Sequence, residues 1–333
     1  MEPVRRPERE RREVELLAPG ATRAADSRGR AEPEEPDEFR TSFERDRDRI
    51  VHSKAFRRLK HKTQVFLNPE GDHYVTRLTH TLQVTQVGRA MAVALGLNEA
   101  LTEAICLAHD VGHSPFGHTG EDALTPYVDG EWLHSAQGVR VLSVLEPLNL
   151  TWEVLDGVRA HTWRIDPPPA TPEGHLCRFA DRIAYLTHDV ADAIRAGVIT
   201  FDDLPASAVG HFGSTSREWI DVMVRAVIRA SSEAGRVTID DETLGVMHEV
   251  RDFMFERVYL RPDGLPDKTQ PVRVIRDLVD WFVHHPDQVP VGYVVDDADH
   301  LTRSIDYVSG MTDRFALSTH DRLFRPSLFD EPR

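Results

Sequence analysis

The chain has 333 residues, 40% of them apolar, so it is long enough for one large helical domain with appendages and a sizeable core. Its formal net charge of −15 argues against broad nucleic-acid binding, which depends on basic surfaces. The sequence lacks the apolar run of about 18 residues that a membrane span requires, and its charged N-terminus lacks the apolar stretch of a secretory signal. The two cysteines, Cys106 and Cys177, are expected to be buried free thiols in a reducing compartment rather than zinc ligands. We therefore expect a cytoplasmic protein without a membrane partner.

The N-terminal segment, residues 1–38, mixes charged residues and prolines with few large apolar ones. Such a segment cannot bury enough apolar surface to offset its ordering entropy, so we predict that it is mostly disordered. A run of arginines and lysines follows between Arg45 and Lys62. In an acidic chain this run is a candidate site for an anion, although a solvated helix face explains any single one of its members.

From Phe43 onward, helical spacing of apolar residues dominates the sequence. Neither a succession of alternating strands nor a solenoid-type repeat is evident, which favours an all-α fold. Loops are predicted where proline, glycine and serine gather, at residues 167–174, 210–216 and 262–266. Apolar residues at helical spacing predict further helices over residues 220–230, 242–258 and 271–284.

The first helix that carries chemistry is predicted over about residues 75–95. His80, Val84, Val87 and Met91 follow one another at steps of four, three and four, so they share one helix face. His80 is therefore predicted to point toward the core. A lone inward histidine is usually a core residue with satisfied hydrogen bonds.

A second predicted helix places His109 on the face shared by Leu101, Ile105 and Ala108, and Asp110 follows directly. Two inward histidines with an adjacent carboxylate are costly to bury without a partner, because isolated polar groups in a core lose their hydration. The pair therefore points to a ligand shared by the two helices.

The segment after this helix reads HDVGHSPFGHTGE over residues 109–121 and surrounds a Gly–Pro turn. His113, His118 and Glu121 can therefore project from a loop rather than sink into a core. If a helix begins near Gly117, His118 and Glu121 lie on one side of its first turn, and the carboxylate can orient the imidazole. A histidine held in this way is suited to act as a proton donor or nucleophile. The alternative is that these are only turn and capping residues.

A third helix, over about residues 176–194, has two stripes. The apolar stripe consists of Phe179, Ile183, Leu186 and Val190. The polar stripe consists of Asp181, Tyr185, His188 and Asp192, with Asp189 beside it. A polar stripe is ordinarily a wet surface, but these short acidic side chains interleaved with tyrosine and histidine fit the wall of a site better.

Imidazole and carboxylate groups are natural ligands of a divalent transition-metal ion. The candidates that the three helices supply are His80, His109, Asp110 and Asp181. This set would leave coordination positions open for water and a substrate oxygen, as a catalytic metal requires.

These residues together resemble the HD phosphohydrolase superfamily, whose pattern H…HD…D reads here as His80, His109–Asp110 and Asp181. The surrounding segments resemble its deoxyguanosine triphosphatase branch, bacterial proteins akin to vertebrate dNTP triphosphohydrolases. The segments that carry this resemblance are FRRLKHKTQVF (56–66), TRLTHTLQV (76–84), AHDVGHSPFGHTGE (108–121), WLHSAQ (132–137), FADRIAYLTHDVADAI (179–194) and DYVSGMTDRFAL (306–317). The resemblance covers about residues 43–317.

The resemblance implies a role for each matching position. The metal would be held by His80, His109, Asp110 and Asp181. Catalysis would depend on the loop residues His118 and Glu121, with His113 close to the phosphates. Contacts to the phosphates, sugar or base are implied for Arg77, Gln64, His134, Arg182, Tyr185 and Asp189. Of these, Arg77 would grip the α-phosphate and Tyr185 would lie beneath the deoxyribose.

The fold that the resemblance implies is an HD-domain helical bundle, residues 39–200, with a helical C-terminal region, residues 201–333, that completes the nucleotide site. The implied reaction is metal-dependent cleavage of a dNTP to a deoxynucleoside and inorganic triphosphate, with Mn, Mg, Fe, Co or Ni as the ion. Family members commonly form homo-oligomers, and a nucleotide effector or single-stranded DNA is a further candidate partner.

Other functions stay open at this point. An HD phosphomonoesterase or cyclic-nucleotide phosphodiesterase would use the same quartet, and a nucleotide-sensing regulator would bind dNTPs without turnover. A Walker-type NTPase is excluded, because the sequence has no GxxxxGK[ST] phosphate-binding loop. Ser135 stands where the family usually has Asn, and Gln83 replaces a frequent Glu, which puts base preference and local packing in doubt rather than activity.

Overall fold

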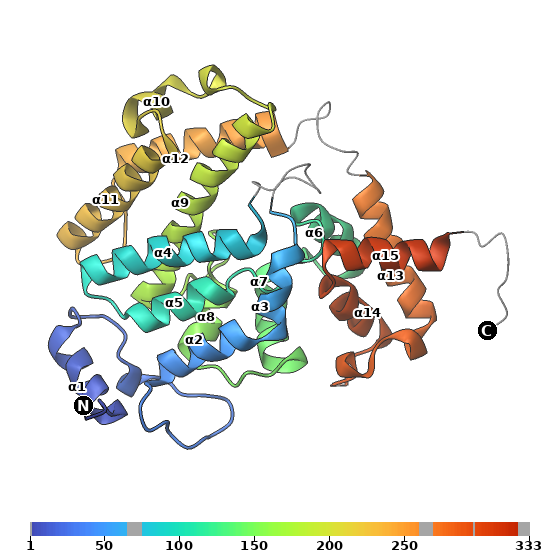
Figure 1. Ribbon diagram of the computed structural model, residues 1–333, viewed down its shortest axis with the longest axis horizontal. Coiled ribbons are helices and arrows are strands. Elements are labelled where there is room, and N and C mark those ends of the chain that lie inside the picture. Colours follow the sequence, from blue (N-terminus) through green and yellow to red (C-terminus); the bar gives the residue numbers. More distant parts are fainter. Residues whose placement is uncertain (1, 65–74, 260–268, 296, 326–333) are drawn as a thin grey trace.

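The computed structural model describes residues 2–64, 75–259, 269–295 and 297–325 (Figure 1). Within these ranges the secondary structure is helical, and extended pairing is limited to two isolated bridges, Arg30–Thr151 and Thr63–Thr76. The predicted all-α fold is confirmed. No helix in the described part of the chain combines the length and apolar character that a membrane span needs.

The helices follow one another with mostly short connections. Their bounds are α1 Arg6–Leu16, α2 Ser42–His52, α3 Lys54–Arg58, α4 Arg77–Leu95, α5 Glu99–Ala108, α6 His118–Leu124, α7 His134–Arg140, α8 Trp152–Arg159, α9 Pro172–Arg195, α10 Ala206–Phe212, α11 Ser216–Ala234, α12 Asp241–Met254, α13 Thr269–His284, α14 His300–Ser309 and α15 Asp313–Phe324. The helices predicted from apolar spacing are therefore present as α4, α5, α9, α11, α12 and α13. The predicted loop at residues 210–216 overlaps the end of α10, and the one at residues 262–266 lies outside the described residues.

Three helices, α4, α5 and α9, pack against one another at the centre of the bundle (Figure 1). Each begins with a side-chain cap, because Thr76, Asn98 and Thr171 accept a hydrogen bond from a backbone N–H of the first turn. Gly96 ends α4 in the left-handed conformation, with φ at 66°. These caps fix where each helix starts and so fix which residues face the centre.

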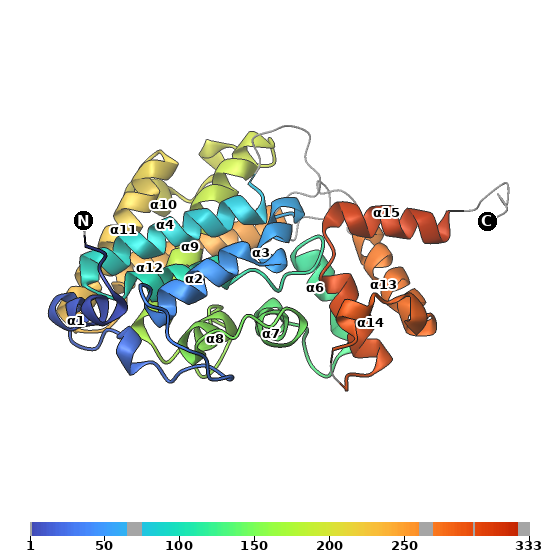
Figure 2. The same ribbon diagram turned by 60° about the horizontal axis from the view of Figure 1, so that its bottom comes forward.

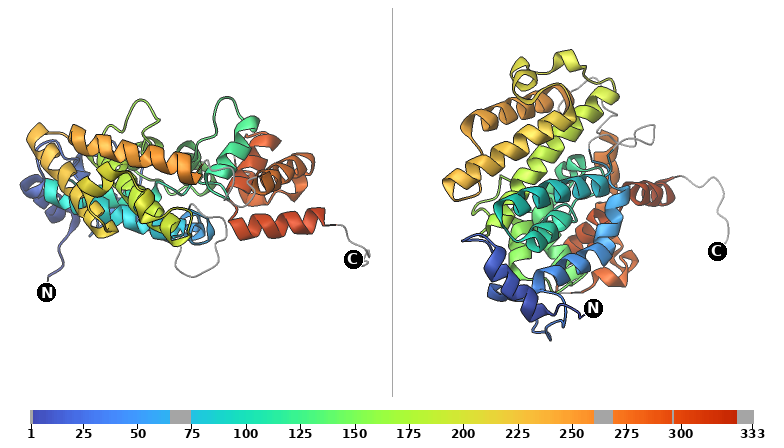
Figure 3. Two further views of the ribbon diagram at one scale, coloured as in Figure 1. Left: turned by 90° about the horizontal axis from the view of Figure 1, so that it is seen from above. Right: turned by 60° about the vertical axis from the view of Figure 1, so that its left-hand side comes forward.

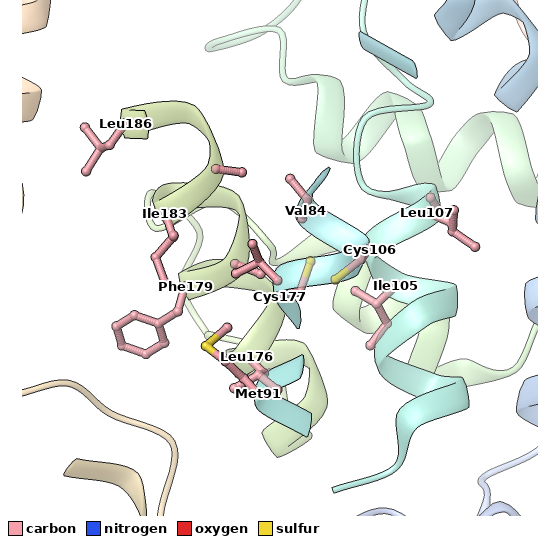
Figure 4. Close-up of a cluster of buried hydrophobic side chains, with 14 of the residues drawn as sticks. Val84, Met91, Ile105, Cys106, Leu107, Leu176, Cys177, Phe179, Ile183 and Leu186 are labelled. Carbon is pink, nitrogen blue, oxygen red and sulfur yellow. The ribbon is translucent and has the colours of Figure 1, made fainter. Parts of the chain in front are cut away.

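The interior between these helices is apolar and closely packed (Figure 4). Gly88 on α4 lies so close to α5 that an added Cβ would be 2.9 Å from Sγ of Cys106. Cys106 and Cys177 are both buried free thiols, as predicted. A hydrogen bond to Cys106, together with burial, raises the pKa of Cys177 well above its usual value, so this cysteine stays a neutral thiol.

The N-terminal segment differs from the predicted disorder. The segment contains α1 and is tied to the bundle by hydrogen bonds, because Glu13 accepts from Ala24 N and Asn98 Nδ2, and Glu173 accepts from Thr22 N. Arg30 forms an ion pair with the fully buried Asp46. Polar contacts of buried carboxylates therefore order a segment that has few large apolar residues.

The apolar core is divided into two clusters. The larger one runs from Ala24 to Val258 and includes α10, α11 and α12. Of these, α11 lies alongside α4 and α9, α12 lies against α9, and α10 packs on α11 and α12 (Figure 3). The smaller one joins α6 to α13, α14 and α15, which sit together at one end of the molecule (Figure 2). Each cluster contains residues from both sides of position 200, so the division between the clusters does not fall there. The domain boundaries 39–200 and 201–333 stay a prediction.

Candidate metal centre and active site

Four side chains from the central helices converge on one point. Nε2 of His80, on α4, lies 3.1 Å from Oδ1 of Asp181, on α9. Nε2 of His109, directly after α5, lies 3.8 Å from the same oxygen and 3.4 Å from Oδ1 of Asp110. His80, His109 and Asp110 each offer a ligand atom within 4.8 Å of the other two. The quartet predicted from helical spacing is thus brought together.

The chemistry of this quartet fits a divalent metal ion. Nδ1 of His109 lies 2.7 Å from the carbonyl oxygen of Cys106, which can only accept, so the proton is on Nδ1. Nε2 of His109 is buried and has no hydrogen-bond partner, which leaves its lone pair for a metal. Burial raises the pKa of Asp110, but electrostatic interactions with His109, His113 and Arg77 lower it well below its usual value. Burial likewise raises the pKa of Asp181, but its hydrogen bond with His80 lowers it, so both carboxylates remain ionised.

The loop after α5 is held closely against α7. An added Cβ on Gly112 would lie 2.1 Å from the carbonyl oxygen of His134 and 2.2 Å from N of Gly138, so only glycine fits there. Gly117 has φ at 58° and ψ at −135°, and α6 begins at the next residue, His118, as predicted. Phe116, directly before Gly117, also has a positive φ, at 63°.

Glu121, on α6, is the centre of a histidine cluster. Its Oε1 lies 2.7 Å from Nδ1 of His113 and 2.9 Å from Nδ1 of His134. Its Oε2 lies 3.5 Å from Nδ1 of His118. The first two rings are at hydrogen-bond distance but not aligned for straight N–H···O bonds. Glu121 was predicted to orient His118, and the structure shows it in contact with three imidazoles.

The cluster members differ in exposure, which corrects one prediction. His113 was expected to project from the loop, yet it is buried, with Nε2 at 3.1 Å from Oδ1 of Asp110. Burial, together with the charge of Arg77, lowers the pKa of His113 to about 4. The His118 side chain is 77% exposed. Crowding by nearby atoms lowers the pKa of His118, whereas the Glu121 carboxylate raises it. The net effect is a raised pKa, because so exposed a ring loses little hydration.

A further histidine, His161, completes the cluster and was not predicted. It follows α8 and is buried, with Nε2 at 3.0 Å from Nε2 of His134. The rings of His134 and His113 stack at 3.8 Å. A signal for His161 exists in the sequence, because Val154, Val158 and His161 follow one another at the spacing that marks His80.

Arg77, the first residue of α4, is buried beside the metal quartet. Its Nη1 donates to Oδ2 of Asp110 at 2.8 Å, while its Nε is buried without a partner. Nη2 approaches Gly117, where an added Cβ would lie 2.9 Å away. Arg77 therefore links the metal quartet to the loop that carries His113 and His118.

The other predicted substrate residues are spread along α9 and beyond. Arg182 lies 3.0 Å from Nε2 of His248 and 3.8 Å from the ring centre of Trp163. Burial raises the pKa of Tyr185 to about 12 and that of Asp189 to about 7, and Asp189 accepts a hydrogen bond of 2.7 Å from Tyr259.

Two further features border the quartet and the histidine cluster. Gln64 has a buried Oε1 without a partner, and its backbone oxygen lies near Gly117. The polar stripe of α9 is not one wall, because Asp192 accepts from Val75 N and His188 lines a separate cavity of about 790 Å³ between α4 and α11.

The C-terminal helices hold the loop between α5 and α6. Asp313 accepts from Phe116 N at 3.0 Å and from Thr63 N at 2.9 Å. The buried Lys62 donates to the carbonyl oxygens of His113 and Ser309, and burial lowers its pKa to about 7. Segment 306–317, which carries part of the family resemblance, contains Ser309 and Asp313 and thus supports this loop.

Three arginines of the basic run that precedes the site, Arg45, Arg47 and Arg49, are paired with acidic groups. Arg49 contacts Glu34 at 2.6 Å, and Arg47 contacts Glu103 at 2.9 Å. These three arginines therefore belong to the protein surface rather than to a site for one bound anion, whereas Lys62 is buried.

Comparisons with known proteins agree with this geometry. Residues 77–186 match the HD domain, and residues 237–322 match the phosphohydrolase-associated domain. The chain is 46% identical to a deoxyguanosinetriphosphate triphosphohydrolase-like protein of Caldanaerobacter subterraneus subsp. tengcongensis, over 95% of this chain and 94% of that protein. Like-named proteins of Desulfatibacillum aliphaticivorans and Clostridium perfringens are 43% and 40% identical, over 96% and 90% of this chain and 97% and 92% of their own lengths. The chain therefore belongs to the deoxyguanosinetriphosphate triphosphohydrolase-like family of HD-domain phosphohydrolases.

Proposed function

We propose that this protein is a metal-dependent dNTP triphosphohydrolase, which converts a dNTP and water into a deoxynucleoside and inorganic triphosphate. The observation that carries the proposal is the juxtaposition of the His80, His109, Asp110 and Asp181 quartet with the histidine cluster around Glu121. The names of its relatives support the same substrate class.

The quartet would hold a divalent ion, with Mn, Mg, Fe, Co and Ni as candidates. When bound, such an ion acts as a Lewis acid toward a phosphate oxygen and lowers the pKa of water. Arg77 is placed beside the quartet with a positive charge that suits the α-phosphate. We propose that it binds that group and keeps it next to the ion.

In the reaction, the oxygen of water bonds to the α-phosphorus and the bond from that phosphorus to the 5′-oxygen breaks. The 5′-oxygen then needs a proton, and His118 is the exposed imidazole whose pKa the Glu121 carboxylate raises against the crowding around it. We propose that His118 donates this proton. The neighbouring His134 and Arg77 would stabilise the negative charge of the triphosphate.

The remaining contacts are proposals of the same kind. Tyr185 would lie beneath the deoxyribose, and Arg182, Asp189 and Gln64 would contact the rest of the nucleotide. Homo-oligomer formation and binding of a nucleotide effector or single-stranded DNA likewise stay predictions.

The test is product analysis. The protein is incubated with each of the four dNTPs and with GTP, in Mn²⁺ or Mg²⁺, and the products are resolved by ion exchange. Deoxynucleoside and inorganic triphosphate in equal amounts are expected. Release of a nucleoside monophosphate or of inorganic phosphate would point to another HD phosphohydrolase activity, and tight binding without products would point to a nucleotide sensor.

A further inference from the structure

Arg182, on α9, carries a buried positive charge that forms no ion pair with the described residues. Arg182 is 8% exposed, and its Nε is buried without a hydrogen-bond partner. Asp181, the residue before it, contacts Nε2 of His80 in the metal quartet. A buried charge without a counter-charge is costly, because it loses its hydration and gains nothing in return. The position of Arg182 therefore suits an anion that comes from outside the chain.

Two neutral groups hold the guanidinium group of Arg182. Its Cζ lies 3.8 Å from the ring centre of Trp163, within the range of a cation–π contact. Its Nη1 donates to Nε2 of His248, on α12, at 3.0 Å. Because a guanidinium group can only donate, Nε2 carries the lone pair and the imidazole is neutral. These contacts fix where the charge lies without cancelling it.

Trp163, in the loop after α8, is itself fixed to α9. Its indole N–H donates to the carbonyl oxygen of Arg178 at 3.1 Å, and its ring meets that of Phe179 edge to face at 5.2 Å. In return, Nη2 of Arg178 donates to the carbonyl oxygen of Thr162 at 3.2 Å. The indole ring therefore has a defined place, although Trp163 is 36% exposed.

A second guanidinium group adds to the positive charge at this place. Cζ of Arg178 lies 5.4 Å from the ring centre of Trp163, and its Nε is buried without a hydrogen-bond partner. Burial, together with the charge of Arg182, lowers the pKa of Arg178. The nearby Arg251 of α12 differs from both, because it pairs with the exposed Asp252 at 3.3 Å. Two cations on one helix, neither paired with a carboxylate in the described part of the chain, suit a ligand with several negative charges.

We propose that Trp163 is a positioning residue that, together with His248, holds Arg182 in place to bind the phosphate chain of a nucleotide. The ligand class is an oligophosphate, because a chain of phosphate groups can match both Arg178 and Arg182. The identification of this oligophosphate as part of a dNTP rests on the proposed function. Since Arg182 directly follows Asp181, a phosphate chain bound by the quartet would extend along α9 to reach it.

Inorganic triphosphate is the probe that tests this site without turnover. Its affinity is measured by titration calorimetry on the full chain with its metal bound. Trp163→Leu removes the aromatic face and should weaken binding about 2–30-fold, the range expected for one cation–π contact. Trp163→Phe keeps an aromatic face and should bind with intermediate affinity. Failure of the unmodified protein to bind triphosphate, or unchanged affinity in a folded Trp163→Leu protein, would overturn the proposal.

The exposed His248 gives a second pair of variants that are expected to fold. His248→Ala removes the acceptor of Arg182 and should weaken triphosphate binding, whereas His248→Gln supplies an amide oxygen and should restore much of it. A purely structural role for His248 would not predict this rescue. Equal affinity in all three proteins would contradict the part of His248 in the proposal.

A matched control is available at the other end of the molecule. Arg28 stacks on Trp152 at the same distance, 3.8 Å, at the start of α8. Trp152→Leu therefore removes a contact of the same kind, and it should leave triphosphate binding unchanged. If Trp152→Leu weakened binding as much as Trp163→Leu, the effect would be one of general stability and the proposal would fail.

Turnover separates this inference from the proposed function. With a dNTP as substrate, Trp163→Leu should raise KM and change kcat little, because the lost contact is made in both the ground state and the transition state. If triphosphate binds and the variants weaken it, but no dNTP yields triphosphate, the proposed function fails while the oligophosphate site stands. If dNTPs are hydrolysed but Trp163→Leu changes neither triphosphate affinity nor KM, the proposed function stands and this inference fails.

Discussion

The two halves of the site are built in different ways. The metal half, His80, His109–Asp110 and Asp181, is supplied by three central helices that pack directly on one another. The histidine half, around Glu121, depends on a loop and on contacts with α14 and α15, which come almost two hundred residues later. Local helical spacing therefore determines the first half, and long-range hydrogen bonds determine the second.

The largest effect should come from breaking the metal half alone. His109→Ala removes a buried ligand nitrogen, so we expect metal content near background and no measurable turnover. Metal analysis of the purified protein checks this. His284→Ala, which removes an exposed histidine of α13, is the matched control and should keep its metal. Full metal content in His109→Ala would contradict the assignment of the quartet.

Breaking the histidine half should leave the metal in place. His118→Ala removes the proposed proton donor, and we expect kcat to fall about 10²–10⁴-fold with metal content unchanged. The measurement is steady-state kinetics alongside metal analysis of the same preparation. Normal hydrolysis of dNTPs by His118→Ala would show that another group donates the proton.

Loosening the support of the loop should have a smaller effect. Asp313→Ala removes the acceptor of Phe116 N in the loop and of Thr63 N and Oγ1 in the segment before α4, so three hydrogen bonds worth about 1 kcal/mol each are lost. We expect kcat to fall roughly tenfold, which corresponds to about 1.4 kcal/mol, because the loop is held less firmly, and we expect the metal to be retained. Asp321→Ala, on the same helix and exposed, is the control. Loss of metal from Asp313→Ala would mean that the two halves are not separable.

The smallest effect concerns Asp189, which lies on α9 beyond Asp181. Its pKa is raised from 3.8 to about 7 by burial, so between these values the folded state keeps a proton that the unfolded state releases. Stability should therefore fall as pH rises from about 4 to 7, with a slope of up to about 1.4 kcal/mol per pH unit. In urea unfolding across this range, the free energy of unfolding of Asp189→Asn should depend less steeply on pH than that of the unmodified protein. Identical slopes would refute the shift.

The same contrast explains what the sequence could predict. His80 and His109 share faces with apolar residues, so periodicity alone places them at the centre of an all-α bundle. His113 was predicted to project from the loop but is buried. Asp110, three residues earlier, contacts its ring, and Lys62, which is 51 residues away, donates to its backbone carbonyl oxygen, a contact without a local signature. His161 follows Val154 and Val158 at helical spacing, which indicates an inward side chain, but it belongs to none of the motifs that carry the family resemblance.

The order of the N-terminal segment could not be predicted from its composition. Its predicted disorder followed from few apolar residues, yet hydrogen bonds to buried Glu173 and the ion pair of Arg30 with Asp46 tie it down. Composition records apolar residues but does not show which carboxylates will be buried elsewhere in the chain.

The contact between Asp313 and Phe116 also bears on the order in which the protein matures. Phe116 has a positive φ, a conformation that costs on the order of 1 kcal/mol or more and persists only when neighbours enforce it. During synthesis, the ligands of the quartet have all emerged once α9 is complete, whereas Asp313 emerges more than a hundred residues later. The residues of the quartet are therefore synthesised well before the residue that holds the loop, and under the proposed function full activity would be acquired only after α15 is in place.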